Sequence, residues 1–516
     1  MSPIKTLNRA RPEAGDVSRR KLVKSLAAVA AAFYIPVPAR AAIVRPKLTV
    51  VLIAEQFRSD YLFRNFNAFN AGGFRRLIEE SAFFPDCRLL STTFTSTGLA
   101  TIATGCYPSL HGIVANRWYE SAGNRLKAAE PFDLAVTTLF QQEPEPANRF
   151  FAVAATESKA GLLKPGAVSG QFFRKPDNTF ATLGAAVGKE PEWLTVFNQA
   201  HLAGKFRDQP WLPRGAPPGS FPLRSLKYDA AKPENFQALL ASSPFAQSAQ
   251  MQLVREVVHA ENLGLNSFDT VVAVLDSIGK LGSETGAVSP LIDDEVLSLD
   301  ADLAALLEWL DARGQPYQIV FTAAHGAPVE PPTTYRVSPD EIVEPVERAL
   351  SAEFAKGKTG FHFVEAYVYP FLYLRHDHLT PSDLPRARQI AGNAALATRH
   401  VSSFITSDGY SPQFSEWNTR ARNSLYRGRS GDVLLAYRPG FVEFVGADRG
   451  VSYGSLWNYD AQVPLLFKGP SFVAGRFDHM VEMTDIAPTL AAVAGMPAPA
   501  AATGRVLSEA FGEGVS

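Results

Sequence analysis

Apolar runs of strand length recur along the chain, separated by segments with a helical pattern. The clearest runs cover residues 48–54, 150–155, 270–275, 319–323 and 463–467. Before the fourth run, apolar residues share one helical face and Gly314 follows as a stop; they are Val296, Leu299, Leu303, Leu306, Leu307 and Leu310. Strands that are apolar on both faces are typical of a parallel sheet covered by helices. The pattern predicts an α/β fold with a doubly wound, mostly parallel sheet sandwiched by helices.

Polar side chains follow three of these predicted strands. Glu55 and Asp276 come directly after their strands, and His325 follows its strand after one further residue. Because ligands of such sheets bind at the carboxyl ends of the strands, these residues define a candidate site. Any one of them taken alone is more often a helix cap or a hydrogen-bonded structural group.

Two Pro- and Gly-rich stretches predict insertions, at about residues 165–244 and 328–431. Residues 433–444 follow the second stretch and predict a β-hairpin that turns at Pro439-Gly440. We expect the insertions to form a cap over the candidate site.

The N-terminus has the order of an export signal. Ser18-Arg19-Arg20-Lys21 precedes a moderately apolar stretch that ends in Ala39-Arg40-Ala41, which is similar to a twin-arginine signal peptide. The apolar stretch is interrupted by prolines and is shorter than the ~20 residues of a membrane-spanning helix. We expect residues 1–41 to be removed and residues 42–516 to be periplasmic or secreted, with no stable membrane span.

Charge and cysteine content exclude several classes of protein. Lys+Arg number 50 and Asp+Glu 51, so no overall positive field favours nucleic acid. Cys87 and Cys106 are the only cysteines, too few for a disulfide scaffold or a thiolate zinc cluster. They either form one disulfide bond or are two separately buried thiols, and the sequence leaves both open.

A series of short motifs carries a resemblance to a known family. In chain order they are EQFRSDYL at 55–62, TFTSTG at 93–98, TGCYPSLHGI at 104–113, NRWY at 116–119, FTAAHG at 321–326 and MTDIAPTL at 483–490. Their order resembles that of the threonine-type, phosphate-irrepressible alkaline phosphatases, relatives of the type I phosphodiesterases and nucleotide pyrophosphatases. The resemblance runs from about residue 47 to 507 and implies an alkaline phosphatase-like fold.

The resemblance also implies a chemistry. Members of the family hydrolyse phosphate esters with two neighbouring zinc ions, one activating a threonine and the other stabilising the leaving oxygen. Thr95 matches the threonine nucleophile, and Asn116 matches the asparagine that donates to the phosphoryl oxygens. As an ordinary cap of a helix, Thr95 would occupy the same place in an inactive protein.

Several zinc ligands of the family are replaced. In the first zinc site Glu55 stands for an aspartate and Ala324 for a second aspartate, which leaves Glu55, Thr95 and His325 as a weak set of donors. In the second site Asp276 is kept, but Lys280 and Tyr453 stand where the family has histidines. A protonated lysine repels a cation and a neutral phenol is a poor ligand, so we expect at most one zinc ion, or none.

The phosphate-binding Lys-x-Arg motif of the family is altered as well. Its best match here reads Glu157-Ser158-Lys159, so Lys159 keeps a charge but lacks the planar fork of an arginine. Lys280 could pair with Asp276, either as a substitute for the metal charge or as a structural ion pair.

These observations predict an exported member of the superfamily, a phosphate-ester hydrolase by descent that is weak or inactive. It would keep a pocket for a small phosphorylated or sulfated ligand, held by Asn116, Lys159, Lys280 and the helix start at Thr95. The alternative is an active hydrolase with a single metal ion, a phosphatase, phosphodiesterase or sulfatase-like enzyme with Thr95 as nucleophile. A structural or partner-binding role leaves no trace in the sequence.

Overall fold

The structure is a computed structural model that describes residues 46–141, 149–164, 169–183, 190–217, 219–355, 357, 360–412, 416–444, 446 and 450–511. These residues belong to one unit, Ile43–Gly512. The predicted signal peptide, residues 1–41, lies outside the described residues. Within those ranges, every helix is too short or too polar to cross a membrane.

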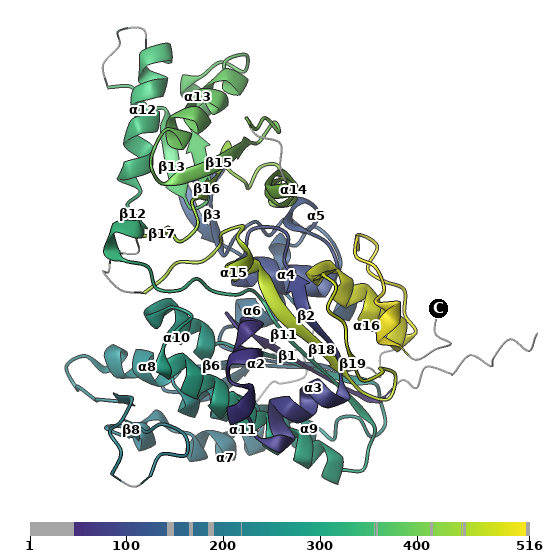
Figure 1. The fold of residues 1–516 in the computed structure, drawn as a ribbon. Helices are drawn as coiled ribbons and strands as arrows, with labels where there is room; N and C mark the ends of the chain where they lie inside the picture. The colour runs from purple at the N-terminus through teal and green to yellow at the C-terminus, as the bar shows by residue number, and fades with distance from the viewer. Residues whose placement is uncertain are drawn as a thin grey trace, which may run out of the picture. The chain divides into compact units, whose positions relative to one another are not determined.

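Ten strands among the described residues form one large sheet, seen through the middle of Figure 1. Its centre is parallel, in the order β11 (Tyr317–Ala323), β1 (Leu48–Ala54), β10 (Asp269–Leu275), β5 (Phe150–Ala154) and β6 (Gly170–Arg174). Antiparallel strands extend it on both sides: β7 (Phe180–Leu183) beside β6, and β18 (Gln462–Lys468) beside β11, followed by β2 (Ala82–Arg88). Short strands β19 (Gly475–Arg476) and β20 (Val481–Glu482) pair with β2. The predicted mostly parallel α/β sheet is confirmed.

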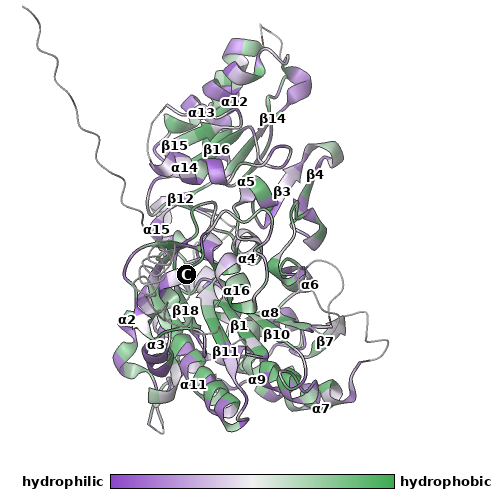
Figure 2. Cartoon of the chain, turned by 90° about the vertical axis from the view of Figure 1, so that its right-hand side faces the viewer, coloured by the Kyte–Doolittle hydropathy of each residue, from purple (hydrophilic) through white to green (hydrophobic). Residues whose placement is uncertain are grey.

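The strands are buried because helices cover the sheet. α9 (Pro244–Ala260) and α11 (Pro290–Ala312) pack on each other along the sheet. A second pair of helices, α4 (Thr95–Thr104) and α16 (Ile486–Ala494), packs together at a different part of the sheet (Figure 1). The predicted apolar face of α11 is fully buried, and hydropathy colouring shows the strands of the sheet as mainly hydrophobic (Figure 2). Ser289 accepts a hydrogen bond from the Ile292 amide and so caps the start of α11.

Part of the first predicted insertion belongs to the main sheet, since β6 and β7 lie within residues 165–244. The remainder contains α7 (Glu192–Ala200), β8 (Pro210–Trp211), β9 (Arg224–Ser225) and α8 (Pro233–Ala241). Trp211 is buried and its indole nitrogen donates to Asp294 of α11 at 2.6 Å. This contact fixes the β8–β9 segment to the helical layer.

The second predicted insertion, residues 328–431, forms a separate four-stranded sheet together with the strand that follows it, in the order β13-β14-β16-β15, so this part of the chain runs past its predicted end. Its strands are β13 (Val364–Val368), β14 (Phe371–Leu374), β15 (Val401–Thr406) and β16 (Val433–Tyr437), accompanied by α12 (Asp340–Phe354) and α13 (Leu384–Leu396). The predicted hairpin over residues 433–444 is wrong. Both edges of β16 are taken by β14 and β15, so β17 (Val442–Glu443) pairs instead with β12 (Arg336–Val337).

Shorter elements connect these parts. They are α2 (Asp60–Arg64), α3 (Arg76–Glu80), α5 (Pro108–His111), β3 (Arg117–Glu120), β4 (Arg125–Ala128), α6 (Glu157–Gly161), α10 (Ser277–Thr285), α14 (Glu416–Asn423) and α15 (Asn458–Ala461).

Candidate functional site

The carboxyl ends of three adjacent strands bring the predicted site residues together. β1 lies between β10 and β11, and the backbone amide of Glu55 donates to Leu275 of β10 while that of Ala324 donates to Ala54 of β1. Glu55, Asp276 and His325 therefore follow neighbouring strands at one edge of the sheet, and all three are buried. Parallel pairing is the physical reason, because it aligns all carboxyl ends on the same side.

Thr95 stands at the first position of α4 and faces two of these residues. Its Oγ1 lies 3.2 Å from Glu55 Oε2 and 3.1 Å from His325 Nε2. α4 can approach this closely because Gly98 faces the backbone of Ala324, where a Cβ on residue 98 would lie 2.0 Å from the Ala324 carbonyl oxygen. The absence of a side chain at Gly98 thus sets the distance between the threonine and the histidine.

The contacts of His325 define which of its nitrogens carries the proton. Nδ1 lies 2.7 Å from the carbonyl oxygen of Gly326, which can only accept, so Nδ1 donates and Nε2 is an acceptor. The single hydroxyl proton of Thr95 therefore has two possible acceptors, Nε2 and Glu55 Oε2, and can be donated to only one at a time. Burial, together with the charge of Lys159, lowers the pKa of His325 to about 4. The imidazole is therefore neutral near pH 7 and has a lone pair available at Nε2.

Asn116 and Tyr453 close the same region. Asn116 Oδ1 accepts from the Ser96 amide in the first turn of α4 at 2.9 Å, and its Nδ2 donates to the Tyr453 hydroxyl at 3.3 Å. The Tyr453 ring stacks on His325 with centroids 4.4 Å apart. Burial and the carboxylate of Glu55 raise the pKa of Tyr453, so the phenol stays protonated.

Lys159 reaches the site from α6. Its Nζ lies 2.5 Å from Glu55 Oε1, so the carboxylate contacts Lys159 through one oxygen and Thr95 through the other. The altered Lys-x-Arg motif, Glu157-Ser158-Lys159, therefore supplies one cation to the site through Lys159. The side chain of Glu157 is exposed. Burial alone would lower the pKa of Lys159, but Glu55 and Asp276 raise it, and the ammonium stays charged.

Asp276 is bound by two cations. Arg174 Nη2 lies 2.8 Å and 2.7 Å from its two oxygens, and Lys280 Nζ lies 2.5 Å from Oδ2. The carboxylate is fully buried and the Arg174 side chain is 4% exposed. Burial would raise the pKa of Asp276, but Arg174, Lys280 and Lys159 together lower it to about 2.

Arg174 is a site residue that sequence reasoning missed. It ends strand β6, so it obeys the rule that pointed to Glu55 and Asp276: a polar side chain at the carboxyl end of a parallel strand. The sequence did not point to Arg174 because its strand, β6, lies within residues 165–244, which were predicted to be an insertion.

The donor sets differ in how well they fit a metal ion. Glu55, Thr95 and His325 bring a carboxylate oxygen, a hydroxyl and a neutral imidazole nitrogen to one place, which suits a single zinc ion. Asp276 does not fit a second ion, since a guanidinium and an ammonium already occupy its oxygens. In the described part of the chain, His, Cys, Asp and Glu side chains alone form no cluster of three that could hold a metal.

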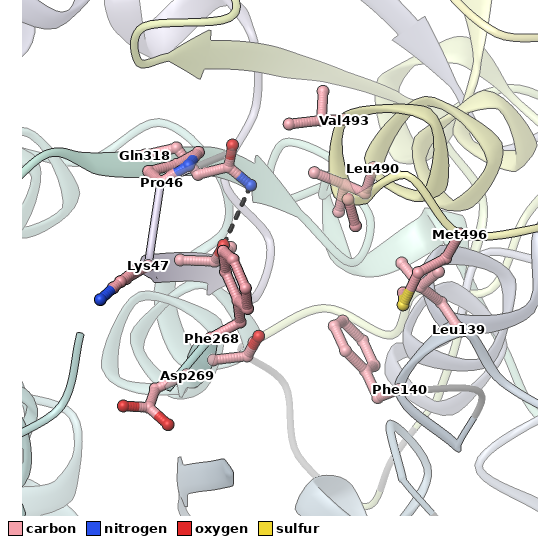
Figure 3. Close-up of a pocket in the computed structure, with 13 residues that line it drawn as sticks. Pro46, Lys47, Leu139, Phe140, Phe268, Asp269, Gln318, Leu490, Val493 and Met496 are labelled. Atoms are coloured by element: carbon pink, nitrogen blue, oxygen red, sulfur yellow. Dashed lines mark hydrogen bonds between the residues drawn. The ribbon is translucent and has the colours of Figure 1, made fainter. Parts of the chain in front are cut away.

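The remaining candidates from the sequence lie elsewhere. Cys87 and Cys106 are both buried and form no disulfide bond, so of the two alternatives the structure has separate thiols. At the amino ends of β1, β10 and β11 there is a pocket of about 40 Å³ between Gln318 and the α16 side chains Leu490 and Val493 (Figure 3). Its one carboxylate among the described lining residues, Asp269, is held bidentately by Arg149.

The fold and this arrangement define a class of protein. A family model described as "Type I phosphodiesterase / nucleotide pyrophosphatase" matches residues 49–448, and the chain belongs to this family. The fold is alkaline phosphatase-like, as the sequence motifs predicted.

Several known proteins are similar to this chain over most of their length. The chain is 25% identical to alkaline phosphatase PafA of Elizabethkingia meningoseptica, over 91% of this chain and 95% of that one. It is also 25% identical to alkaline phosphatase PhoV of Synechococcus elongatus, over 90% and 93% of the two chains. The crystal structure of PafA superimposes with a TM-score of 0.79 at 21% identity, covering 91% of this chain and 100% of PafA. Murine ectonucleotide pyrophosphatase/phosphodiesterase 5 shares the fold with a TM-score of 0.53 at 13% identity, over 87% and 95% of the two chains.

Proposed function

We propose that this protein is an exported member of the family that binds small phosphorylated or sulfated molecules and hydrolyses them weakly or not at all. The observation that carries the proposal is Asp276, whose two oxygens are held by Arg174 and Lys280. A two-metal mechanism needs this carboxylate for the ion that stabilises the leaving group. With the carboxylate neutralised by protein cations, Asp276 would be a poor ligand for that ion.

The ligand would bind beside Thr95. Asn116 Nδ2 donates to Tyr453, Lys159 pairs with Glu55, and Thr95 begins α4, so hydrogen-bond donors and positive charge lie on the residues around the threonine and suit a tetrahedral oxyanion. Related folds support this ligand class: an inactive variant of murine ectonucleotide pyrophosphatase/phosphodiesterase 5 has been solved with AMP, and phosphonoacetate hydrolase of Sinorhizobium meliloti with phosphonoacetate.

A second function, an active hydrolase with one metal ion, is favoured by a specific geometry. Glu55, Thr95 and His325 would hold the ion, which when bound would supply the positive charge that makes the threonine hydroxyl more acidic. Because Nδ1 of His325 donates to Gly326, the ion would bind Nε2, so the hydroxyl proton of Thr95 would pass to solvent rather than to that nitrogen. Asn116 would orient the bound oxyanion.

The two functions are separated by Thr95→Ala in the mature protein, residues 42–516. For a binding protein, the affinity for a phosphate ester such as phenyl phosphate should change by only a few fold, and release of phosphate should be near background before and after the change. For an enzyme, all turnover should disappear with Thr95→Ala, while the matched change Thr398→Ala in the second insertion should leave it intact. Turnover that matches that of PafA under the same conditions would overturn the proposal.

Metal content tests the observation at Asp276 directly. After incubation with excess zinc and removal of unbound ion, we expect at most one zinc per chain. Introducing the family histidines with Lys280→His and Tyr453→His should not add a second zinc, because Arg174 still occupies Asp276. Adding Arg174→Ala to these changes should raise the zinc content. A second zinc in the unchanged protein would contradict the assignment.

Export is proposed from the sequence alone. Expressed in a bacterium with a twin-arginine pathway, the chain should be recovered outside the cytoplasm with Ala42 as its first residue, as measured by mass spectrometry. Replacing Arg19 and Arg20 with lysine should retain it in the cytoplasm. Retention of the full-length chain before any change would contradict the proposal.

A further inference from the structure

A second pocket adjoins the ion pair of Asp276. It has a volume of about 190 Å³ and is lined by Ala155, Arg174, Lys175, Pro176, Asn178, Gln237, Leu240, Ala241 and Lys280. Among these described lining residues there are three cations and two amides but no carboxylate. We propose that this pocket binds a small tetrahedral oxyanion, such as phosphate or sulfate, without a metal ion.

The cations are held in place by the fold. Arg174 and Lys280 both bond to Asp276, a fully buried carboxylate beneath the pocket that is not part of its lining. These contacts fix the two side chains before any ligand arrives, so binding loses little side-chain entropy. One carboxylate balances one of the two charges, and the excess positive charge remains beside the pocket.

Lys175 is fixed by its turn. It is the first residue of the connection between β6 and β7, where its amide donates to the Thr179 carbonyl at 2.7 Å and its carbonyl accepts from the Asn178 amide at 2.9 Å. The neighbouring carboxylate of Asp177 accepts from the Thr179 amide and hydroxyl, at 3.0 Å and 2.5 Å, and so is engaged within the turn. Lys175 itself is exposed, which leaves its ammonium able to reach an anion in the pocket.

The size and chemistry of the pocket select the ligand. Lysine and arginine donate charge-assisted hydrogen bonds to phosphate and sulfate oxygens, and the pocket volume suits a small anion better than a nucleotide. The anion could be free in solution or be the anionic group of a larger ligand. The site does not depend on any reaction at Thr95 and goes beyond the proposed function.

The test is titration calorimetry of the mature protein with inorganic phosphate, at low ionic strength and after metal removal with EDTA. Lys175→Glu should weaken phosphate binding about tenfold or more, since it reverses a charge at the pocket. Lys205→Glu, which changes an exposed lysine of the same segment that does not line the pocket, should leave it unchanged. Because Lys175 is exposed and Asp276 keeps both partners, the variant should fold normally.

Asn116→Ala separates this site from the one at Thr95. The pocket is supported if Lys175→Glu weakens phosphate binding and Asn116→Ala does not. It is also supported if the protein binds two phosphates, one weakened by Lys175→Glu and the other by Asn116→Ala. Phosphate binding that responds only to Asn116→Ala, or no binding at millimolar phosphate, would overturn it. If Lys175-dependent binding persists while no Asn116-dependent binding exists, the proposed function fails and the pocket stands. Phenyl phosphate should compete for the Lys175-dependent site if the pocket receives part of a larger ligand, and should not compete if it receives the free anion.

Discussion

Replacing Arg174 with methionine keeps much of the side-chain volume but removes one of the two cations that balance Asp276. The carboxylate is fully buried and would keep only Lys280, whose side chain is 42% exposed. Breaking a buried ion pair costs about 3–5 kcal/mol, and the remaining lysine places this case near the lower end. The pKa of Asp276 gives a consistent figure. The drop from 3.8 to about 2, which the cations achieve against the opposing effect of burial, corresponds to a net contribution of about 2 kcal/mol to stability at pH 7. We therefore expect Arg174→Met to lower the free energy of unfolding by about 2–3 kcal/mol.

The assay is urea denaturation of the mature protein at pH 7, followed by tryptophan fluorescence. Arg224→Met is the matched control, because its ion pair with Glu284 is half exposed on the carboxylate side and should contribute about 0–1 kcal/mol. Because the folded pKa of Asp276 is lowered, its contribution is present above pH 3.8 and is lost as the pH falls toward 2. The cost of Arg174→Met should thus be about 1 kcal/mol smaller at pH 3 than at pH 7. If both arginine variants cost the same small amount, Arg174 does not balance the buried carboxylate.

Two further predictions concern the helix that carries Thr95 and its surroundings. Gly98→Ala should destabilise the protein by about 1–3 kcal/mol, measured by thermal denaturation, because the added Cβ would overlap the Ala324 carbonyl. The control is Gly204→Ala, which should be nearly neutral in the same assay because no atom lies within 4 Å of the added Cβ. Burial, with a contribution from Arg429, lowers the pKa of His111 from 6.5 to about 3, so the stability it supplies is present above pH 6.5 and is lost as the pH falls toward 3. We expect the free energy of unfolding to fall by about 2 kcal/mol between pH 7 and pH 5 because of this histidine. If His111→Gln loses the same free energy over this pH range, another group is responsible.

The pattern of the amino-acid sequence predicted the fold class and most of the residues that gather in the candidate site. Continuous apolar runs marked the central strands β1, β5, β10 and β11 because a strand buried on both faces is apolar at most of its positions. Polar residues at the ends of these strands marked the site for an equally local reason, since parallel strands end on one side of the sheet. The motif around Thr95 could be recognised in the sequence because its residues lie within one helical turn and the segments directly beside it.

The ion-pair partners of the charged groups and the pairing partners of the strands depend on the tertiary structure. Arg174 meets Asp276 across 102 residues, and this contact exists only because β6 joins the sheet through β5. The predicted hairpin over residues 433–444 failed for a related reason: a local turn does not show that both edges of β16 are already occupied. Patterns in a sequence report on neighbours within a few residues, whereas the cation that occupies a buried carboxylate is set by which distant strands pack side by side.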